Sequence, residues 1–198
     1  VTRAIGGLQI IDITNPSAPL LVGSYDTAGV PFGVTIAGSY AYVADGGEGL
    51  RIINIENPEA PQEVGSYDTP GDAYDVTIAG NYAYVADGYR GLRIINVKNP
   101  SAPLLVGFYD TPDEAVGVTI AGSYAYVAAH SEGLRIINVK NPSAPQEVGF
   151  YNDTFGRAEA VTIVGSYAYV AYDYHGLRII NITNPEAPLL VGSYDKPG

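Results

Sequence analysis

The residues of this chain that could do chemistry stand in columns, with one member in each of several similar stretches of sequence. Four arginines each follow a Gly-Leu pair, and five aspartates recur where a run of apolar residues ends. The members are Arg51, Arg93, Arg135 and Arg178 in the first column and Asp26, Asp68, Asp110, Asp153 and Asp195 in the second. A ring of arginines could bind an anion, and carboxylates gathered on loops could bind calcium, which takes several oxygen ligands.

Both columns also have a structural interpretation, which we favour. Arginine can pair with a carboxylate on the neighbouring copy, and aspartate opens turns by accepting hydrogen bonds from its own backbone. None of the loops has the residue spacing of a calcium-binding loop. We therefore predict no metal site, no cofactor and no catalytic residue, with calcium binding as the alternative.

Further candidates occupy loops whose sequence differs from copy to copy, at 45–48, 87–90, 129–132 and 172–175, and at 30–32, 72–74, 113–115 and 155–157. Loops on a rigid scaffold commonly carry function, so this variation favours a ligand-binding face, although drift on a solvated surface would look the same. The candidate binding face consists of Glu48, Tyr74, Tyr89, Arg90, Asp113, His130, Glu132, Phe155, Arg157, Tyr174 and His175. The two histidines lie in equivalent loops, where solvation is the commoner role.

The symmetry of the columns bears on catalysis. An enzyme usually needs different residues in different roles, for instance the acid and the base of the carboxylate pair in a glycosidase. Here each acid of the aspartate column is copied from one stretch to the next. The sequence therefore favours a non-enzymatic protein. The alternative is a calcium-dependent ligand or carbohydrate binder, or an enzyme, that uses the variable loops.

The elements that must position these residues form a tandem repeat, a feature to be tested before any other. Asn-Pro pairs begin at positions 15, 57, 99, 141 and 184, and Gly-Leu pairs keep the same steps of 42 or 43 residues. In the copy at residues 72–113, four short strands are expected at 76–79, 82–86, 92–97 and 104–109. Gly80-Asn81 is a two-residue hairpin signal, and Pro100 and Pro103 place a loop between the last two strands.

These strands predict an all-β fold, a β-propeller of four-stranded antiparallel blades. A unit of about 40 to 45 residues is the size of one blade. Strands 82–86 and 92–97 are apolar on both faces, as expected for a sheet covered on both sides by neighbouring sheets. The paired tyrosines of each second strand, such as Tyr82 and Tyr84, are interpreted as blade packing. The chain reads as one domain, 1–198, with a partial blade at 1–30 and full blades at 31–71, 72–113, 114–156 and 157–198.

The stretch GLRIINVKNPSAPLLVG resembles the LVIVD-repeat family of β-propellers, and the resemblance extends over the whole chain. The chain departs from the family pattern at one position, where the acidic residue is kept as Asp12 but is Asn54, Asn96, Asn138 and Asn181 in the other copies. The resemblance implies a secreted or surface-attached protein. It implies no particular activity.

Composition narrows the possible partners. The formal net charge of −11 argues against nucleic acid, whose phosphates require lysine and arginine, and against an anionic membrane surface. No apolar run approaches the roughly 18 residues of a membrane-spanning helix. The chain has no cysteine, so thiol chemistry and disulfides are excluded.

The first copy lacks its first two strands, which leaves three alternatives: an excerpt of a longer propeller, an irregular ring, or an open edge that another copy completes. The residues that open the fourth strand alternate between Leu-Leu, as at Leu104, and Gln-Glu, as at Gln146. This alternation indicates either duplication of a two-copy block or alternate apolar outer edges for a partner. We expect an extracellular or cell-surface scaffold for protein interaction or self-assembly, including an oligomer or filament.

Overall fold

The computed structural model describes residues 2–3, 7–153, 156–173 and 175–195, which form β-strands and loops without a helix. The strands make five antiparallel sheets in chain order. The first sheet contains β1 (Thr2–Arg3), β2 (Gly7–Asp12) and β3 (Leu20–Tyr25). The second contains β4 (Gly33–Ala37), β5 (Tyr40–Ala44), β6 (Leu50–Asn54) and β7 (Gln62–Tyr67), and the third contains β8 (Asp75–Ala79), β9 (Tyr82–Ala86), β10 (Leu92–Asn96) and β11 (Leu104–Tyr109).

The last two sheets repeat this order. The fourth contains β12 (Gly117–Ala121), β13 (Tyr124–Ala128), β14 (Leu134–Asn138) and β15 (Gln146–Tyr151). The fifth contains β16 (Ala158–Val164), β17 (Tyr167–Tyr172), β18 (Gly176–Asn181) and β19 (Leu189–Tyr194). In the third sheet the second and fourth strands match the expected ranges, whereas the first begins at Asp75 and the third ends at Asn96.

Glycine sets the turns that join these strands. Gly80, between β8 and β9, has a φ of 59°, and Asn81 after it does not have a positive φ. This combination is typical of the type II′ hairpin turn, which the Gly-Asn pair predicts. Gly91, which opens the Gly-Leu pair, has a φ of 70°, and a Cβ there would lie 2.3 Å from the Tyr109 carbonyl oxygen. The Gly-Leu pair recurs because no other residue fits this position.

The hydrophobic core lies between the sheets. Neighbouring isoleucines on one strand point to opposite sides: Ile94 packs in the cluster shared with the fourth sheet, and Ile95 in the cluster shared with the second. A register shift between these residues marks a bulge against β11. Tyr42, Tyr84 and Tyr126 are buried in the three clusters between complete sheets, as the packing interpretation predicts.

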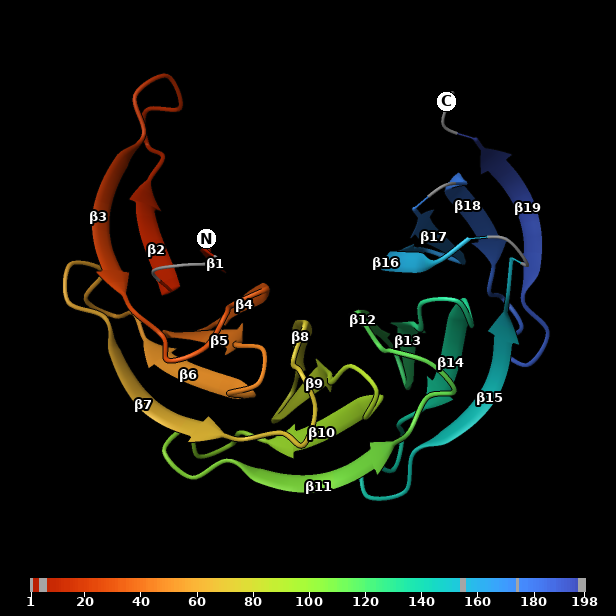
Figure 1. The fold of residues 1–198 in the computed structure, drawn as a ribbon, viewed down its shortest axis with the longest axis horizontal. Coiled ribbons are helices and arrows are strands. Elements are labelled where there is room, and N and C mark those ends of the chain that lie inside the picture. The colour runs from red at the N-terminus through yellow and green to blue at the C-terminus, as the bar shows by residue number, and fades with distance from the viewer. Residues whose placement is uncertain (1, 4–6, 154–155, 174, 196–198) are drawn as a thin grey trace.

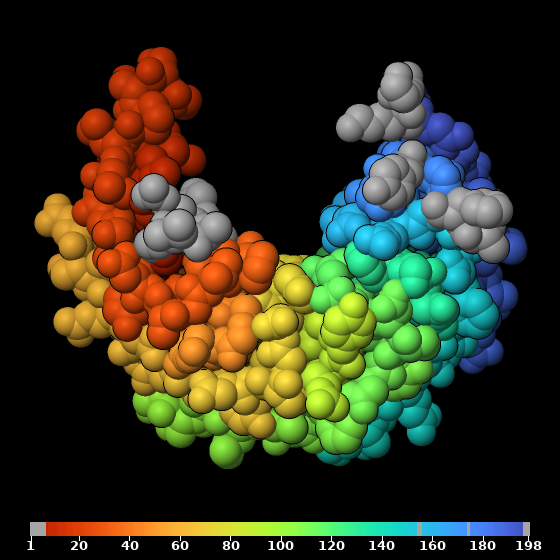
Figure 2. Space-filling model, in the orientation of Figure 1, coloured from red at the N-terminus to blue at the C-terminus, as the bar shows by residue number. Residues whose placement is uncertain are grey.

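The sheets fan around a common centre, with β4, β8, β12 and β16 innermost and β7, β11, β15 and β19 on the outside (Figure 1). The inner strands of the four complete sheets contact one another in sequence, β4 with β8, β8 with β12 and β12 with β16. The five sheets do not close into a ring: a wide gap separates the first sheet from the fifth (Figure 2). The prediction of an all-β fold is confirmed, and the arrangement is that of an open arc.

Candidate binding surfaces

The variable loops of consecutive sheets are joined by backbone hydrogen bonds. The loop between a second and a third strand pairs with the loop that enters the next sheet or with the first residue of that sheet, at Gly46↔Ala73, Gly88↔Ala115 and His130↔Ala158. Gly46 and Gly88 have positive φ, and His130 occupies the equivalent position with a φ of 45°. The loops that form the predicted candidate binding face therefore lie together on one face of the arc, along the second to fifth sheets.

A pocket of about 340 Å³ opens on this face beside the innermost strands. Four of its lining residues occupy the same position in four consecutive sheets, just before or at the start of the first strand: Phe32, Tyr74, Val116 and Glu159. Glu114 and His130 complete the lining. We call this the axial pocket. Of its six residues, only Tyr74 and His130 were in the predicted face.

The walls of the axial pocket differ in chemistry. The rings of Phe32 and Tyr74 are tilted against each other with centroids 4.9 Å apart. His130 lies between two carboxylates, with its Nε2 3.5 Å from Glu159 Oε1 and its Nδ1 4.0 Å from Glu114 Oε2. Burial, together with the hydrogen bond to Glu114 and the charge of that carboxylate, raises the pKa of Tyr74 to about 12.

The remaining predicted face residues are mostly scattered around this pocket. Tyr89, Arg90 and Arg157 are exposed, and the Arg157 N–H donates to Asp173 at 3.0 Å. Glu48 and Glu132 bind the arginine column, and the His175 Nδ1 lies 4.0 Å from Asp153. Phe155 and Tyr174 lie outside the described residues. The structure thus brings together part of the predicted face.

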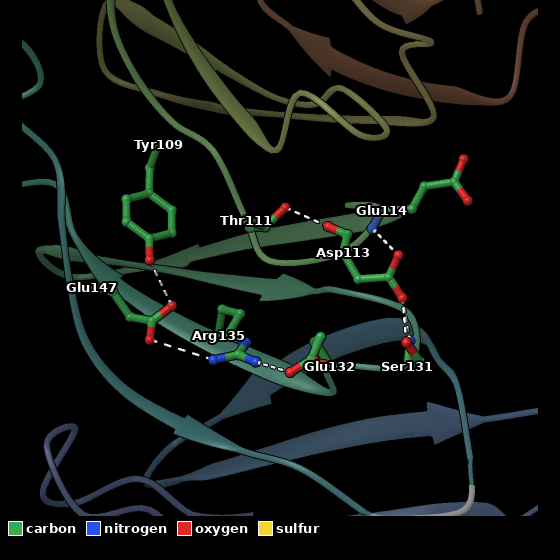
Figure 3. Close-up of polar contacts among 8 residues, drawn as sticks. All are labelled: Tyr109, Thr111, Asp113, Glu114, Ser131, Glu132, Arg135 and Glu147. Atoms are coloured by element: carbon green, nitrogen blue, oxygen red, sulfur yellow. Dashed lines mark hydrogen bonds and ion pairs between the residues drawn. The ribbon is translucent and has the colours of Figure 1, made fainter.

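Asp113 belongs to a polar network at the loop that enters the fourth sheet (Figure 3). Its carboxylate accepts a hydrogen bond from the Ser131 hydroxyl and from the N–H groups of Ser131 and Glu114. Burial alone would raise the pKa of Asp113, but these hydrogen bonds lower it below its ordinary value. The Glu114 carboxylate points away from this network (Figure 3) and lies instead in the axial pocket, beside Tyr74 and His130.

The arginine column is neutralised by carboxylates. Arg93 lies 2.9 Å from Asp110 and 3.5 Å from the buried Asp87, and Arg178 lies 2.5 Å from Asp153 and 2.7 Å from Asp195. The expected partner on the adjacent sheet occurs only for Arg178 among the described pairs. The other arginines pair within their own sheet because the side chain runs toward its own loops and outer strand. An anion site at this column is therefore not supported.

The same geometry explains half of the Leu-Leu and Gln-Glu alternation. Glu147 on β15 accepts a hydrogen bond from the Tyr109 hydroxyl of the preceding sheet at 3.0 Å and lies 3.4 Å from Arg135 (Figure 3). Glu63 makes the equivalent contacts with Tyr25 and Arg51, at 3.3 and 3.7 Å. The leucines of the alternate sheets, by contrast, are exposed on the outer strands: Leu20, Leu21, Leu104, Leu105, Leu189 and Leu190.

A second hollow, which is mainly apolar, lies where the first sheet is narrow. Its volume is about 470 Å³, and we call it the edge groove. It is lined by Leu8, Gln9, Ile10, Ile11, Ile13, Pro19, Val34, Ile36, Ala41 and Ile55. Ile36 is 58% exposed there, whereas its counterparts Ile78 and Ile120 pack against the clusters between complete sheets.

Among the described residues of the first sheet, no strand with the tyrosine pattern of β5 and β9 lies at this boundary. Tyr42 packs in the cluster that includes Ile78, and Tyr84 in the cluster that includes Ile120. In the first sheet, the described strand β1 pairs with β2 only at Thr2↔Leu8 and Arg3↔Gly7. The inner edge of β2 at residues 10–12 therefore has no strand opposite it among the described residues.

At the other end of the arc, the fifth sheet leaves one face uncovered. Tyr169, Leu177 and Ile179 are partly exposed there, and Tyr194 is exposed, although the counterparts Tyr126, Leu134 and Ile136 are buried against a following sheet. We call this surface the free face. It has the same residue types as the buried faces between complete sheets, so it is apolar because the repeat sequence is the same.

The LVIVD repeat model matches five consecutive segments of the chain, at residues 4–27, 28–69, 70–111, 113–153 and 155–196. The chain belongs to the LVIVD repeat family. The one departure from the family pattern has a simple physical reason: Asp12 Oδ1 accepts the Thr14 N–H at 2.8 Å, and Asn54 Oδ1 accepts the Glu56 N–H at the same distance. A search of curated proteins returns no match to this LVIVD repeat chain.

Solved structures similar to this LVIVD repeat protein share its fold at low sequence identity. A functionally unknown protein from Desulfotomaculum acetoxidans has a TM-score of 0.72 and 14% identity, over 94% of this chain and 62% of its own. The computationally designed Ika8 protein has a TM-score of 0.71 and 5% identity, over 89% and 54%. BamB from Moraxella catarrhalis, which is propeller-like, has a TM-score of 0.65 and 14% identity, over 83% and 50%.

These likenesses concern the fold alone. The chain spans roughly half to three fifths of the length of these three structures. Within the described residues, the structure contains no helix that is long and apolar enough to cross a membrane.

Proposed function

We propose that this repeat scaffold is a non-enzymatic extracellular protein that binds a partner polypeptide by accepting a β-hairpin in the edge groove. The observation that carries the proposal is the inner edge of β2 beside the apolar groove, which has no strand opposite residues 10–12 among the described residues. An unpaired strand edge is a template for another strand, and addition of a strand to a sheet edge is a common mode of peptide recognition.

The complete sheets indicate the register of the added strand. In the third sheet, Ile94, Ile95 and Asn96 pair with Tyr84, Ala83 and Tyr82. The equivalent positions on β2 are Ile10, Ile11 and Asp12. A strand with the sequence Tyr-Ala-Tyr, antiparallel to β2, would therefore place a tyrosine side chain against Ile36.

The energetics favour this occupant. Ile36 is 58% exposed, so removing the rest of its side chain from water is worth about 1–2 kcal/mol, a little over half the value for a fully exposed isoleucine. Tyrosine adds a large apolar ring, and its hydroxyl can still reach solvent or a polar partner. The hairpin in question has the sequence of the chain's own repeat, so the proposal includes assembly with other polypeptides of this repeat into an oligomer or filament.

Support for a non-enzymatic scaffold comes from the charged columns. Each arginine of the third strands is held by at least two carboxylates, which leaves these groups with a structural role. The extracellular location is supported by the family resemblance of the sequence. Protease treatment of intact source cells tests it: loss of the protein is expected, and full protection would contradict a surface location.

A labelled peptide with the sequence of residues 33–42, GVTIAGSYAY, tests the hairpin-binding proposal by fluorescence anisotropy. We expect saturable binding to the wild-type protein, weakened at least tenfold when both tyrosines of the peptide are replaced by serine. Ile36→Asp in the protein should also abolish binding. Leu104→Asp is the matched control, because Leu104 is similarly exposed on the outer strand β11 and lies outside the edge groove.

Two results would overturn the proposal. One is the absence of saturable binding; the other is equal binding of the tyrosine and serine peptides. Self-assembly is tested separately by light scattering at rising protein concentration. A mass that increases with concentration, and falls in Ile36→Asp, supports assembly through the edge groove, whereas a strictly monomeric protein argues against it.

A further inference from the structure

The axial pocket has a composition that the repeat does not require. Elsewhere in the core, equivalent positions carry the same residue, as Tyr42, Tyr84 and Tyr126 do. In the axial pocket, one repeat position supplies Phe32, Tyr74, Val116 and Glu159. A position that is repeated in the backbone but diversified in its side chains, where all copies face one hollow, is suited to a ligand that lacks the symmetry of the arc.

One side of the axial pocket is aromatic. The Phe32 and Tyr74 rings lie 4.9 Å apart at an interplanar angle of 58°, so they form two walls of a corner rather than a flat stack. Aromatic faces carry negative electrostatic potential and attract cations within about 6 Å of the ring centre. Such a corner suits an organic cation with an apolar surface.

Another part of the axial pocket is acidic and adjoins Tyr74, whose hydroxyl is hydrogen-bonded to Glu114. Glu114 and Glu159 both line it, and their side chains are 15% and 45% exposed. Among the ion pairs of the described residues, neither glutamate has an arginine or lysine partner, and His130 is the only basic group near them. This contrasts with Glu48 and Glu132 on the same face of the arc, each of which binds an arginine.

The arrangement favours an organic cation over a metal ion. Within the part of the chain that the structure describes, no group of three or more acidic or histidine side chains could hold a metal. Phe32 supplies no metal ligand, and the Tyr74 hydroxyl is hydrogen-bonded to Glu114. The two rings can instead cover the carbon atoms of an alkylated ammonium or the plane of a guanidinium. The pocket volume of about 340 Å³ fits a head group or a single side chain.

We propose that the axial pocket is a binding site for an alkylammonium or guanidinium group, held between the Phe32–Tyr74 corner and the carboxylates of Glu114 and Glu159. The group can belong to a free amine or to a lysine or arginine side chain of a partner protein. His130 occupies the acidic side in the structure, so an incoming cation replaces its contacts with the two glutamates.

The probes are chosen to separate charge from shape. Choline is compared by isothermal titration calorimetry with 3,3-dimethylbutanol, a neutral molecule of nearly the same shape. Gly-Lys-Gly and Gly-Arg-Gly peptides, with blocked termini, test a protein source of the cation. We expect choline or a basic peptide to bind at least tenfold more tightly than the neutral alcohol. The cation that binds most tightly among the three identifies the source.

Single substitutions locate the site. Glu159→Gln and Phe32→Ala should each weaken binding of the cation at least fivefold, because one removes charge and the other an aromatic wall. His130→Gly, which introduces the residue found at the equivalent Gly46 and Gly88, should strengthen binding. Glu186→Gln, in an exposed loop outside the axial pocket, is the control and should leave binding unchanged.

The outcome is decisive in either direction. Cation binding that depends on Glu159 and Phe32 supports the proposal. Equal binding of choline and the neutral alcohol, no saturable binding of any cation, or cation binding that both substitutions leave intact would overturn it. Circular dichroism spectra check that the variants are folded, and the comparison of choline with the alcohol needs no variant. Hairpin binding in the edge groove involves other residues, so either proposal can fail alone.

Discussion

Gly107→Ala is expected to destabilise the protein through a clash between neighbouring sheets. Gly107 lies on β11, and an ideal Cβ built there would be 2.1 Å from the Pro142 carbonyl oxygen of the fourth sheet. The φ of Gly107 is not in the left-handed region. Alanine is therefore compatible with the backbone of the third sheet itself, and the strain comes from the neighbour.

The size of the effect follows from this contact. Carbon and oxygen atoms rarely approach closer than about 3.3 Å, so the two sheets must separate locally by about 1 Å. Overpacking of this kind costs about 1–3 kcal/mol. For a chain of this size, each kcal/mol lowers the melting temperature by about 2–4 °C, which predicts a decrease of about 2–12 °C.

Gly192→Ala is the matched control, because Gly192 has the same place in the repeat on β19. No following sheet covers it, and the nearest atom to an added Cβ is the Ile179 Cδ1 at 3.5 Å, an ordinary contact. Its melting temperature should change by no more than about 2 °C, the effect of a typical surface substitution. Thermal melts followed by circular dichroism make the comparison, and equal melting of the two variants would refute the reasoning.

Three further predictions concern other contacts and one strained backbone position. Ile136→Ala should cost about 2–5 kcal/mol in urea unfolding, whereas Ile179→Ala on the free face should cost less than half as much; similar losses would contradict burial between sheets. Burial and the hydrogen bond to Glu147 raise the pKa of Tyr109 to about 12, which favours the neutral phenol in the fold. The contribution of Tyr109 to the free energy of unfolding is therefore fully present below about pH 10 and is lost as the pH rises toward 12. The free energy of unfolding measured against alkaline pH should fall less in Tyr109→Phe than in the wild type. His130→Gly should raise stability by up to about 1 kcal/mol, because glycine adopts the φ of 45° without strain; a clear loss in thermal melts would contradict this.

Much of the fold could be predicted from the sequence, because apolar residues on both faces of the repeated strands indicate that each sheet is covered on both sides. Adjacent isoleucines such as Ile94 and Ile95 predict sheets covered on two faces, and the structure places them in different clusters. The recurrence of Asn-Pro and of the glycine in the fourth strand has a joint cause that pattern alone did not reveal: Gly107 and Pro142 meet across the boundary between two sheets.

The axial pocket was only partly predictable. Phe32, Tyr74 and Val116 follow one another at the repeat spacing, but the extra residue in the last copy shifts the fourth member to Glu159. An alignment of the copies that allowed for this insertion would have found the position. Which loop residues share a hollow, however, depends on the rotation between sheets, and a linear repeat does not record that rotation.

The pairing of the arginine column shows a second limit. Spacing alone predicts that Arg93 and an aspartate of a neighbouring copy could meet, yet Arg93 binds Asp87 and Asp110 of its own sheet. Candidate partners at several sequence separations are chemically equivalent. Only the direction of the side chain along the sheet decides between them.

Hydrogen–deuterium exchange of the wild-type protein, with and without the peptide of residues 33–42, tests the central claim that the first sheet accepts a strand. Pairing in the proposed register should slow exchange in β2 at residues 10–12 and in β4, which forms the wall of the edge groove, and leave the outer strand β11 unchanged. Protection confined to outer strands or to the free face, or no protection at a saturating peptide concentration, would contradict the claim.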